Sequence, residues 1–264
     1  MSNKIKFAVG AALFGLSVSA NAGVVDLFDT PDFIQDLTIS DGGVSSSVVT
    51  GGGDILGAER DIYVEKLTGT SVNSGVQMDI SGGSMAFSVD SLQSGTGTVQ
   101  WDGAIDAGST TLDVDGLGGV DLTEGGTLNA FALDVLEADL GFTFEIGLYT
   151  DANFWSVASL TSSAVSLPGA TNYLLFSDFL LCGAVTPTAT ITCGGAFPAW
   201  QPVDFSNLGA IELVIDPLGA AGRLDMALDN VTTVPEPSVL GLIGAGLLAG
   251  GFVARRRKNE NKTA

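Results

Sequence analysis

Apolar and polar residues alternate with a period of two along much of this chain. The clearest runs lie at 85–89, 142–148, 211–215 and 224–228. A β-strand directs successive side chains to opposite faces, so these runs predict antiparallel strands with one face on a core and one in water. The alternation restricts the fold more than any other feature, and it favours an all-β protein.

Glycine-rich clusters separate the alternating runs and predict tight turns between strands. They lie at 41–43, 51–53, 81–83, 118–119 and 125–126. Roughly a dozen short strands joined by such turns indicate a single antiparallel β-sandwich, jelly-roll-like in topology. No long amphipathic helix is predicted, and only 134–140 is expected to form a helical turn or two.

Charge and composition exclude several classes of function. The 264 residues include 30 Asp and Glu, only 10 Lys and Arg, and no His, for a formal net charge of −20. Without His there is no Ser-His-Asp or Cys-His catalytic group and no His metal ligand. Binding to nucleic acid phosphates requires Lys and Arg, so we expect no nucleic acid partner.

The first 22 residues have the order of a secretory signal peptide. A basic start precedes a short apolar run at 7–18, which is too short to span a bilayer. Ala20 and Ala22 then fit a small-x-small cleavage pattern, which makes Gly23 the expected first residue after signal peptidase. We therefore assign 1–22 to a signal peptide that directs export.

The last residues, 234–264, form a second targeting segment. A short motif precedes an apolar run at 239–254, and a basic cluster follows it: Val234, Pro235, Glu236, Pro237 and then Arg255, Arg256, Arg257, Lys258. As a helix the apolar run would span about 24 Å, slightly short of a ~30 Å hydrocarbon core. The basic cluster is expected to stay cytoplasmic, which places the preceding domain outside the cytoplasm. The sequence thus predicts a C-terminal transmembrane sorting helix.

This tail resembles the PEP-CTERM sorting signal of Gram-negative bacteria. The resemblance implies recognition by a membrane-embedded exosortase and processing near 235–237. It also implies transient insertion in the inner membrane, followed by location at the cell surface or in the extracellular matrix. Exopolysaccharide is the further partner that the resemblance suggests.

Residues 23–233 remain as one acidic β-sandwich domain. Arg60, Lys66 and Arg223 are its only bases, against 28 acidic residues, so this part has a net charge of −25. Arg60 lies between Glu59 and Asp61, and a planar guanidinium pairs well with carboxylates. We expect Arg60 to act as a structural clamp on nearby carboxylates.

Cys182 and Cys193 are the only cysteines. An even number of cysteines in an exported chain predicts a disulfide. Closing a loop of this size stabilises the folded state by about 3 kcal/mol in the chain-entropy model.

Two groups of residues are candidate ligand sites. Asp113, Asp115 and Asp121 form the densest acidic loop, which is either a solvated loop or a calcium site, since Ca²⁺ prefers several oxygen ligands. Trp101 and Trp200 are candidates for stacking on sugar rings, although core packing is the alternative for both.

These observations favour a non-catalytic protein over an enzyme. The leading hypothesis is a structural or adhesive component of the exopolysaccharide layer, with no cofactor. A calcium-assisted carbohydrate-binding module is the alternative. A glycoside hydrolase comes third, because two carboxylates suffice for that chemistry but must lie about 5–9 Å apart across a cleft.

Overall fold

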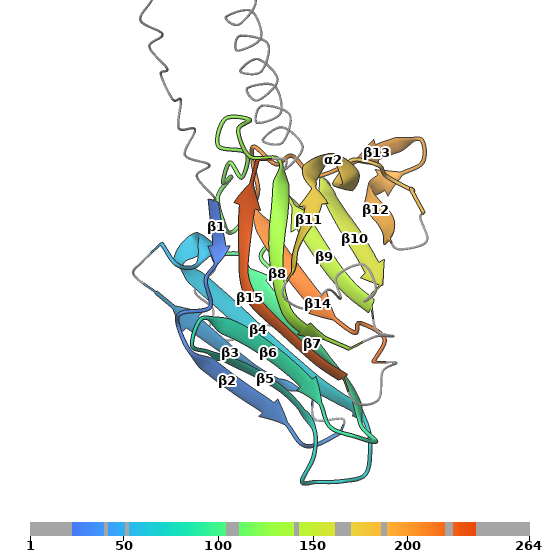
Figure 1. The fold of residues 1–264 in the computed structure, drawn as a ribbon. Helices are drawn as coiled ribbons and strands as arrows, with labels where there is room; N and C mark the ends of the chain where they lie inside the picture. The colour runs from blue at the N-terminus through green and yellow to red at the C-terminus, as the bar shows by residue number, and fades with distance from the viewer. Residues whose placement is uncertain are drawn as a thin grey trace, which may run out of the picture.

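The alternating runs form strands, and the fold is built almost entirely from them (Figure 1). The computed structural model describes residues 23–39, 42–50, 53–103, 111–139, 143–161, 170–185, 189–219 and 224–235. These residues form fifteen strands in two antiparallel sheets, which confirms the predicted all-β sandwich. The only helices among them are short: η1 (Leu56–Ala58) and α2 (Phe176–Phe179).

One sheet has seven strands and contains both the first and the last of the described strands. In spatial order its strands are β11 (Ala170–Leu175), β8 (Ala130–Ala138), β15 (Leu224–Val234), β6 (Ser84–Val89), β5 (Val76–Ser81) and β2 (Asp32–Asp36), with β1 (Gly23–Asp26) also paired to β15.

The other sheet has eight strands and packs face to face with the first (Figure 1). In spatial order its strands are β13 (Ala199–Gln201), β12 (Ala189–Ala196), β10 (Trp155–Thr161), β9 (Thr143–Tyr149), β14 (Ala210–Ile215), β7 (Ser94–Trp101), β4 (Glu59–Thr68) and β3 (Val44–Val49).

The hydrophobic core lies between the two sheets and uses the apolar face that the alternation predicted. The eight-stranded sheet contributes residues such as Ile62, Ile146 and Leu213, and the seven-stranded sheet contributes residues such as Phe87 and Met226. Each of these side chains is at most 4 % exposed. The residues between them in sequence face outward, so the two-residue period determines which side chains form the core and which form the surface.

The glycine cluster at 81–83 forms the tight turn that was predicted there, whereas residues 41, 51 and 52 of two other clusters lie outside the described residues. Gly82 and Gly83 join β5 to β6 as a two-residue turn, with Ser81 paired to Ser84 on either side. Both glycines have positive φ, +62° and +81°. Such hairpin turns require positive φ at both central positions, which glycine adopts without strain.

The expected helical turn at 134–140 is wrong for its described part. Residues 134–138 belong to strand β8, which pairs with β15 on one side and β11 on the other. Two neighbouring strands supply backbone hydrogen-bond partners along this segment, and that pairing outweighs the local helix preference of its Leu, Glu and Ala residues.

The two ends of the domain lie side by side at one end of the sandwich. Gly23 in β1 pairs with Thr233 near the end of β15. The expected signal residues Ala20 and Ala22, and the tail from Glu236 onward with Pro237 and the basic cluster at 255–258, lie outside the described residues. Within the described ranges, no helix is long and apolar enough to cross a membrane.

Candidate functional site

A buried ion pair links the two sheets near the start of the domain. Arg60 in β4 donates to both oxygens of Asp26 in β1, at 3.1 and 3.2 Å, and both side chains are fully buried. The guanidinium also donates to the Thr30 carbonyl at 2.7 Å and lies 5.8 Å from the centre of the Phe28 ring. The predicted role of Arg60 as a carboxylate clamp is confirmed.

Trp101 belongs to this buried network. It is 1 % exposed, and its indole N–H donates to Asp26 Oδ2 at 2.8 Å. Of the two alternatives for Trp101, sugar stacking is therefore wrong and core packing is confirmed. Trp101 ends strand β7 on the core side, and the buried carboxylate of Asp26 provides the partner that a buried indole N–H needs.

The partners of Asp26 compensate the cost of burying its carboxylate. Burial raises the pKa of its carboxyl above the ordinary value, although Arg60 and the hydrogen bonds from Trp101 and Phe28 oppose that effect. Removing any of these partners leaves a buried charge less compensated.

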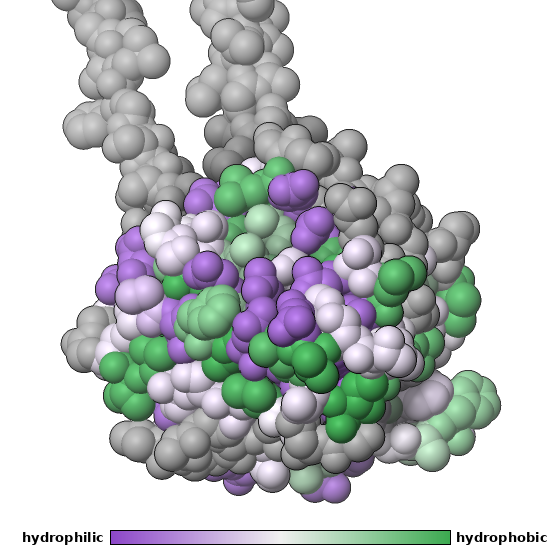
Figure 2. Space-filling view, turned by 90° about the horizontal axis from the view of Figure 1, so that it is seen from below, coloured by the Kyte–Doolittle hydropathy of each residue, from purple (hydrophilic) through white to green (hydrophobic). Residues whose placement is uncertain are grey.

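Among the residues that the structure describes, acidic side chains are exposed but both basic side chains are buried. Lys66 is 2 % exposed, and its ammonium donates to the carbonyls of Leu37, Ser71 and Ser74 at 2.6–3.0 Å. Arg60 is buried as well, and Arg223 lies outside the described residues. Acidic groups therefore determine the electrostatic potential of this surface. On the face shown in Figure 2, hydrophilic and hydrophobic residues are interleaved.

The outer face of the eight-stranded sheet carries a row of hydrogen-bonding side chains. Strand pairing sets Asp61 of β4 opposite Gln100 of β7, Gln100 opposite Glu212 of β14, and Glu212 opposite Gly147 of β9. Gln100 donates to Glu212 Oε1 at 2.8 Å, and the side chains of Asp61 and Gln100 are buried, each at most 4 % exposed. The register of the strands thus brings together polar residues that lie far apart in the sequence.

Two aromatic residues adjoin this polar row. Tyr149 of β9 pairs with Trp155 of β10, and their ring centres lie 6.5 Å apart. Both residues are partly buried. The Tyr149 hydroxyl lies 3.5 Å from Glu212 Oε2, and its ring covers Gly147, where a Cβ would come within 2.8 Å of the ring. We call Gln100, Glu212, Tyr149 and Trp155 the polar–aromatic face.

Burial on this face raises the pKa of Glu212 above its ordinary value. Desolvation is the main cause, and the neighbouring carboxylates Glu145 and Asp102 add to it, while hydrogen bonds from Gln100 and Tyr149 oppose it. Burial and Glu212 together raise the pKa of the Tyr149 hydroxyl. The phenol is therefore a neutral hydrogen-bond group at neutral pH.

This shift predicts how stability depends on pH. A raised pKa means that the folded state binds the Glu212 proton more tightly than the unfolded state does, so stability falls as pH rises above the ordinary value of 4.5. In Glu212→Gln, the free energy of unfolding is expected to fall less between pH 4.5 and 7 than in the unaltered protein. Urea unfolding at several pH values measures the difference.

Asp229→Asn, at an exposed position of β15, controls for the loss of one negative charge. A pH dependence of stability that is unchanged in Glu212→Gln would contradict the raised pKa of Glu212.

In the acidic loop expected as a calcium site, the carboxylates of Asp113 and Asp121 accept hydrogen bonds within their own turns. Asp121 accepts hydrogen bonds from Thr123 and from the Gly125 N–H, which lower its pKa. Asp113 and Asp115 share a separate turn, in which the Asp115 N–H lies 3.5 Å from the Asp113 carboxylate. The structure does not bring the three together, and in the part of the chain that it describes no group of three or more Asp, Glu or Cys is placed to hold a metal ion.

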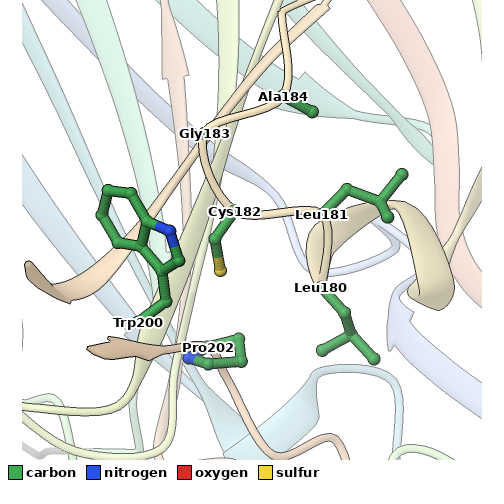
Figure 3. A pocket seen from close by; sticks show the side chains of 7 residues that line it. All are labelled: Leu180, Leu181, Cys182, Gly183, Ala184, Trp200 and Pro202. Atoms are coloured by element: carbon green, nitrogen blue, oxygen red, sulfur yellow. The ribbon is translucent and has the colours of Figure 1, made fainter. Parts of the chain in front are cut away.

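The predicted disulfide between Cys182 and Cys193 is present. It joins the segment after α2 to strand β12, with 5.5 Å between the two Cα atoms. An open pocket of about 590 Å³ lies beside it, lined by Leu180, Leu181, Cys182, Gly183, Ala184, Trp200 and Pro202. The Trp200 ring and the two leucines flank opposite sides of this pocket (Figure 3).

Trp200 is the one predicted ligand aromatic that reaches the surface. It is 37 % exposed and packs edge-on against Phe197, with 6.4 Å between the ring centres. The side chains around it are apolar, whereas those around Tyr149 and Trp155 are polar. The domain therefore has two different aromatic surfaces.

Comparison with known families finds one match. The family model of the PEP-CTERM protein-sorting motif matches residues 233–258, which confirms the resemblance seen in the sequence. The motif is an exosortase recognition signal, so this chain is an exosortase-targeted protein that is exported and sorted to the cell envelope or surface. No match is found among curated proteins.

Sequence reasoning missed the polar–aromatic face. Its four residues come from four different strands, β7, β14, β9 and β10, and the alternating pattern indicates only that such strands have a solvent face. The spacing of Glu145, Gly147 and Tyr149 was the available signal, because a glycine between outward positions leaves room for a neighbouring ring.

Proposed function

We propose that this protein is a non-catalytic, exosortase-processed component of the cell surface or extracellular matrix with an adhesive role in the exopolysaccharide layer. Its tail at 234–264 inserts in the inner membrane during sorting and is then removed. The polar–aromatic face of the eight-stranded sheet is the surface that contacts glycan. The observation that carries the adhesive role is the placement of the partly exposed Tyr149 and Trp155 rings beside the partly exposed Glu212 carboxylate, to which the buried Gln100 donates a hydrogen bond.

The chemistry of this face suits a sugar polymer. Aromatic rings pack against the apolar faces of sugar rings, while carboxylate and phenol groups such as those of Glu212 and Tyr149 exchange hydrogen bonds with sugar hydroxyls. Because the surrounding surface is acidic, we expect neutral or amino-bearing glycans to bind in preference to acidic ones. Calcium would change that order by bridging acidic glycan to the protein's carboxylates.

A glycan array tests this proposal. The full chain is applied to neutral, amino-bearing and acidic bacterial polysaccharides, with and without calcium. Binding to neutral or amino-bearing polymers without calcium supports adhesion through the polar–aromatic face. Binding only with calcium supports the calcium-assisted module instead, and release of reducing ends would show that the protein is a hydrolase.

A pair of variants locates the binding surface. Trp155→Ala is expected to weaken glycan binding roughly fivefold, since an aromatic contact is worth about 1 kcal/mol. Trp200→Ala is the matched control, because Trp200 lies in the separate apolar pocket, and it is expected to leave binding unchanged. Equal effects of the two variants on glycan binding, or loss of binding only in Trp200→Ala, would contradict the placement of the glycan site on the polar–aromatic face.

A further inference from the structure

One segment of this acidic domain carries no charge. Residues 179–203 contain no Asp, Glu, Lys or Arg, although residues 23–233 as a whole have a net charge of −25. The segment begins at Phe179, the last residue of α2, and includes the disulfide, β12 and β13.

Five large apolar side chains of this segment are exposed: Leu180, Leu181 and Trp200 line the pocket of Figure 3, Phe197 packs against Trp200, and Val185 follows Ala184 of the pocket in sequence. We call them the apolar rim: Leu180 at 48 %, Leu181 at 56 %, Val185 at 75 %, Phe197 at 80 % and Trp200 at 37 % exposed. Single exposed apolar residues are common on proteins, but a concentration of them in one uncharged segment indicates a surface that contacts something apolar.

The rim is held firmly on the sandwich. Phe176 and Phe179 of α2 are buried and pack with Phe131 and Phe205, and the ring centres of Phe176 and Phe205 lie 4.2 Å apart. The disulfide then ties the chain to β12 immediately after Leu181. These contacts fix where the exposed side chains stand relative to the sheets.

The rim lies at the end of the sandwich where the sorting tail begins. The Val234 carbonyl accepts a hydrogen bond from the Asn129 N–H at 3.0 Å, and the Asn129 carbonyl accepts one from the Phe176 N–H at 2.9 Å. Two backbone hydrogen bonds therefore connect the last residue of β15 to the first residue of α2. Figure 1 shows α2 and β13 at the same end as the tip of β15.

We propose that the apolar rim rests on the surface of the bilayer into which the tail inserts. Trp, Phe and Leu side chains partition favourably into the membrane interface. An uncharged surface also avoids the repulsion that the rest of this acidic domain would meet at anionic headgroups. The contact would hold the motif at 234–237 close to the bilayer, where a membrane-embedded exosortase acts. The inference rests on the membrane insertion proposed above for the tail.

Quenching of tryptophan fluorescence by brominated lipid tests the contact. The full chain is reconstituted in phosphatidylcholine vesicles that carry bromine on the acyl chains near the headgroup. We expect part of the emission to be quenched and Trp200→Phe to lose that quenched part. Trp155→Phe, which alters the outer face of the eight-stranded sheet, is expected to retain it.

A second pair of variants alters the surface without removing the reporter. Phe197→Asp places a charge on the rim and is expected to reduce quenching, whereas Leu92→Asp is the control. Leu92 is 90 % exposed, and it follows β6 at Val89, which pairs with Leu224 at the far end of β15. Circular dichroism and an intact disulfide confirm that each variant is folded.

The same samples distinguish this inference from the proposal on which it rests. Protection of the apolar peptide 239–254 from added protease reports insertion of the tail. Absence of Trp200 quenching overturns the rim contact whether or not the tail is protected. An unprotected tail contradicts the membrane insertion, and equal quenching in Phe197→Asp and Leu92→Asp also overturns the rim contact.

Discussion

Replacing Arg60 with methionine is expected to lower the free energy of unfolding by about 3–5 kcal/mol, the range for removing one partner of a buried ion pair. The change would leave the Asp26 carboxylate buried with only the N–H groups of Trp101 and Phe28 to compensate it. It would also remove the guanidinium from the Thr30 carbonyl. Chemical denaturation of both proteins at neutral pH measures the loss.

The pH dependence of this loss identifies its cause. Without Arg60 the pKa of Asp26 rises further, so the folded variant gains a proton, and with it stability, as pH falls. The difference between Arg60→Met and the unaltered protein should therefore shrink at acidic pH.

The double variant Asp26→Asn/Arg60→Met tests whether the uncompensated Asp26 carboxylate causes the loss, because it has no charge at either position. We expect it to be more stable than Arg60→Met alone. A loss under 1 kcal/mol in Arg60→Met would show that the ion pair does not hold the sheets together.

Removing the disulfide is expected to be the second large effect. In Cys182→Ala/Cys193→Ala, the free energy of unfolding should fall by about 3 kcal/mol, because the unfolded chain regains the entropy of an open loop of this size. Alanine is preferred to serine at these positions because Cys193 is 3 % exposed, and a buried hydroxyl would add its own cost. Calorimetry of oxidised protein and of the double variant provides the comparison.

Reduction provides the control for this variant. Dithiothreitol should destabilise the unaltered protein by a similar amount and leave the double variant unchanged. Mass spectrometry under non-reducing conditions should find no free thiol in the exported protein. Two free thiols there would contradict a structural role for the bond.

Sequence patterns with local causes were reliable guides to this fold. The two-residue period at 85–89, 211–215 and 224–228 predicted strands and their buried faces, because side-chain direction in a strand depends only on position along it. The glycines at 82 and 83 predicted a turn for a similarly local reason. The helical turn expected at 134–140 was wrong because pairing with two distant strands determined the structure there.

Residue roles that depend on distant partners were less predictable. The sequence indicated that Arg60 would bind carboxylates, but its partner Asp26 lies 34 positions away in the other sheet. Trp101 was a candidate for a ligand surface, with core packing as the alternative, and the sequence did not decide between the two. The burial of Trp101 depends on Asp26 supplying a hydrogen-bond acceptor inside the core.

The sequence alone determined the sorting tail, the acidic character, the sandwich class and the disulfide. Each of these depends on composition, on a short motif or on a local period. Only the tertiary structure placed Glu212 beside Tyr149, buried both described bases, and set the uncharged segment 179–203 next to the start of the tail. Those arrangements follow from strand register and sheet packing, which join residues far apart in the chain and leave no local pattern in the sequence.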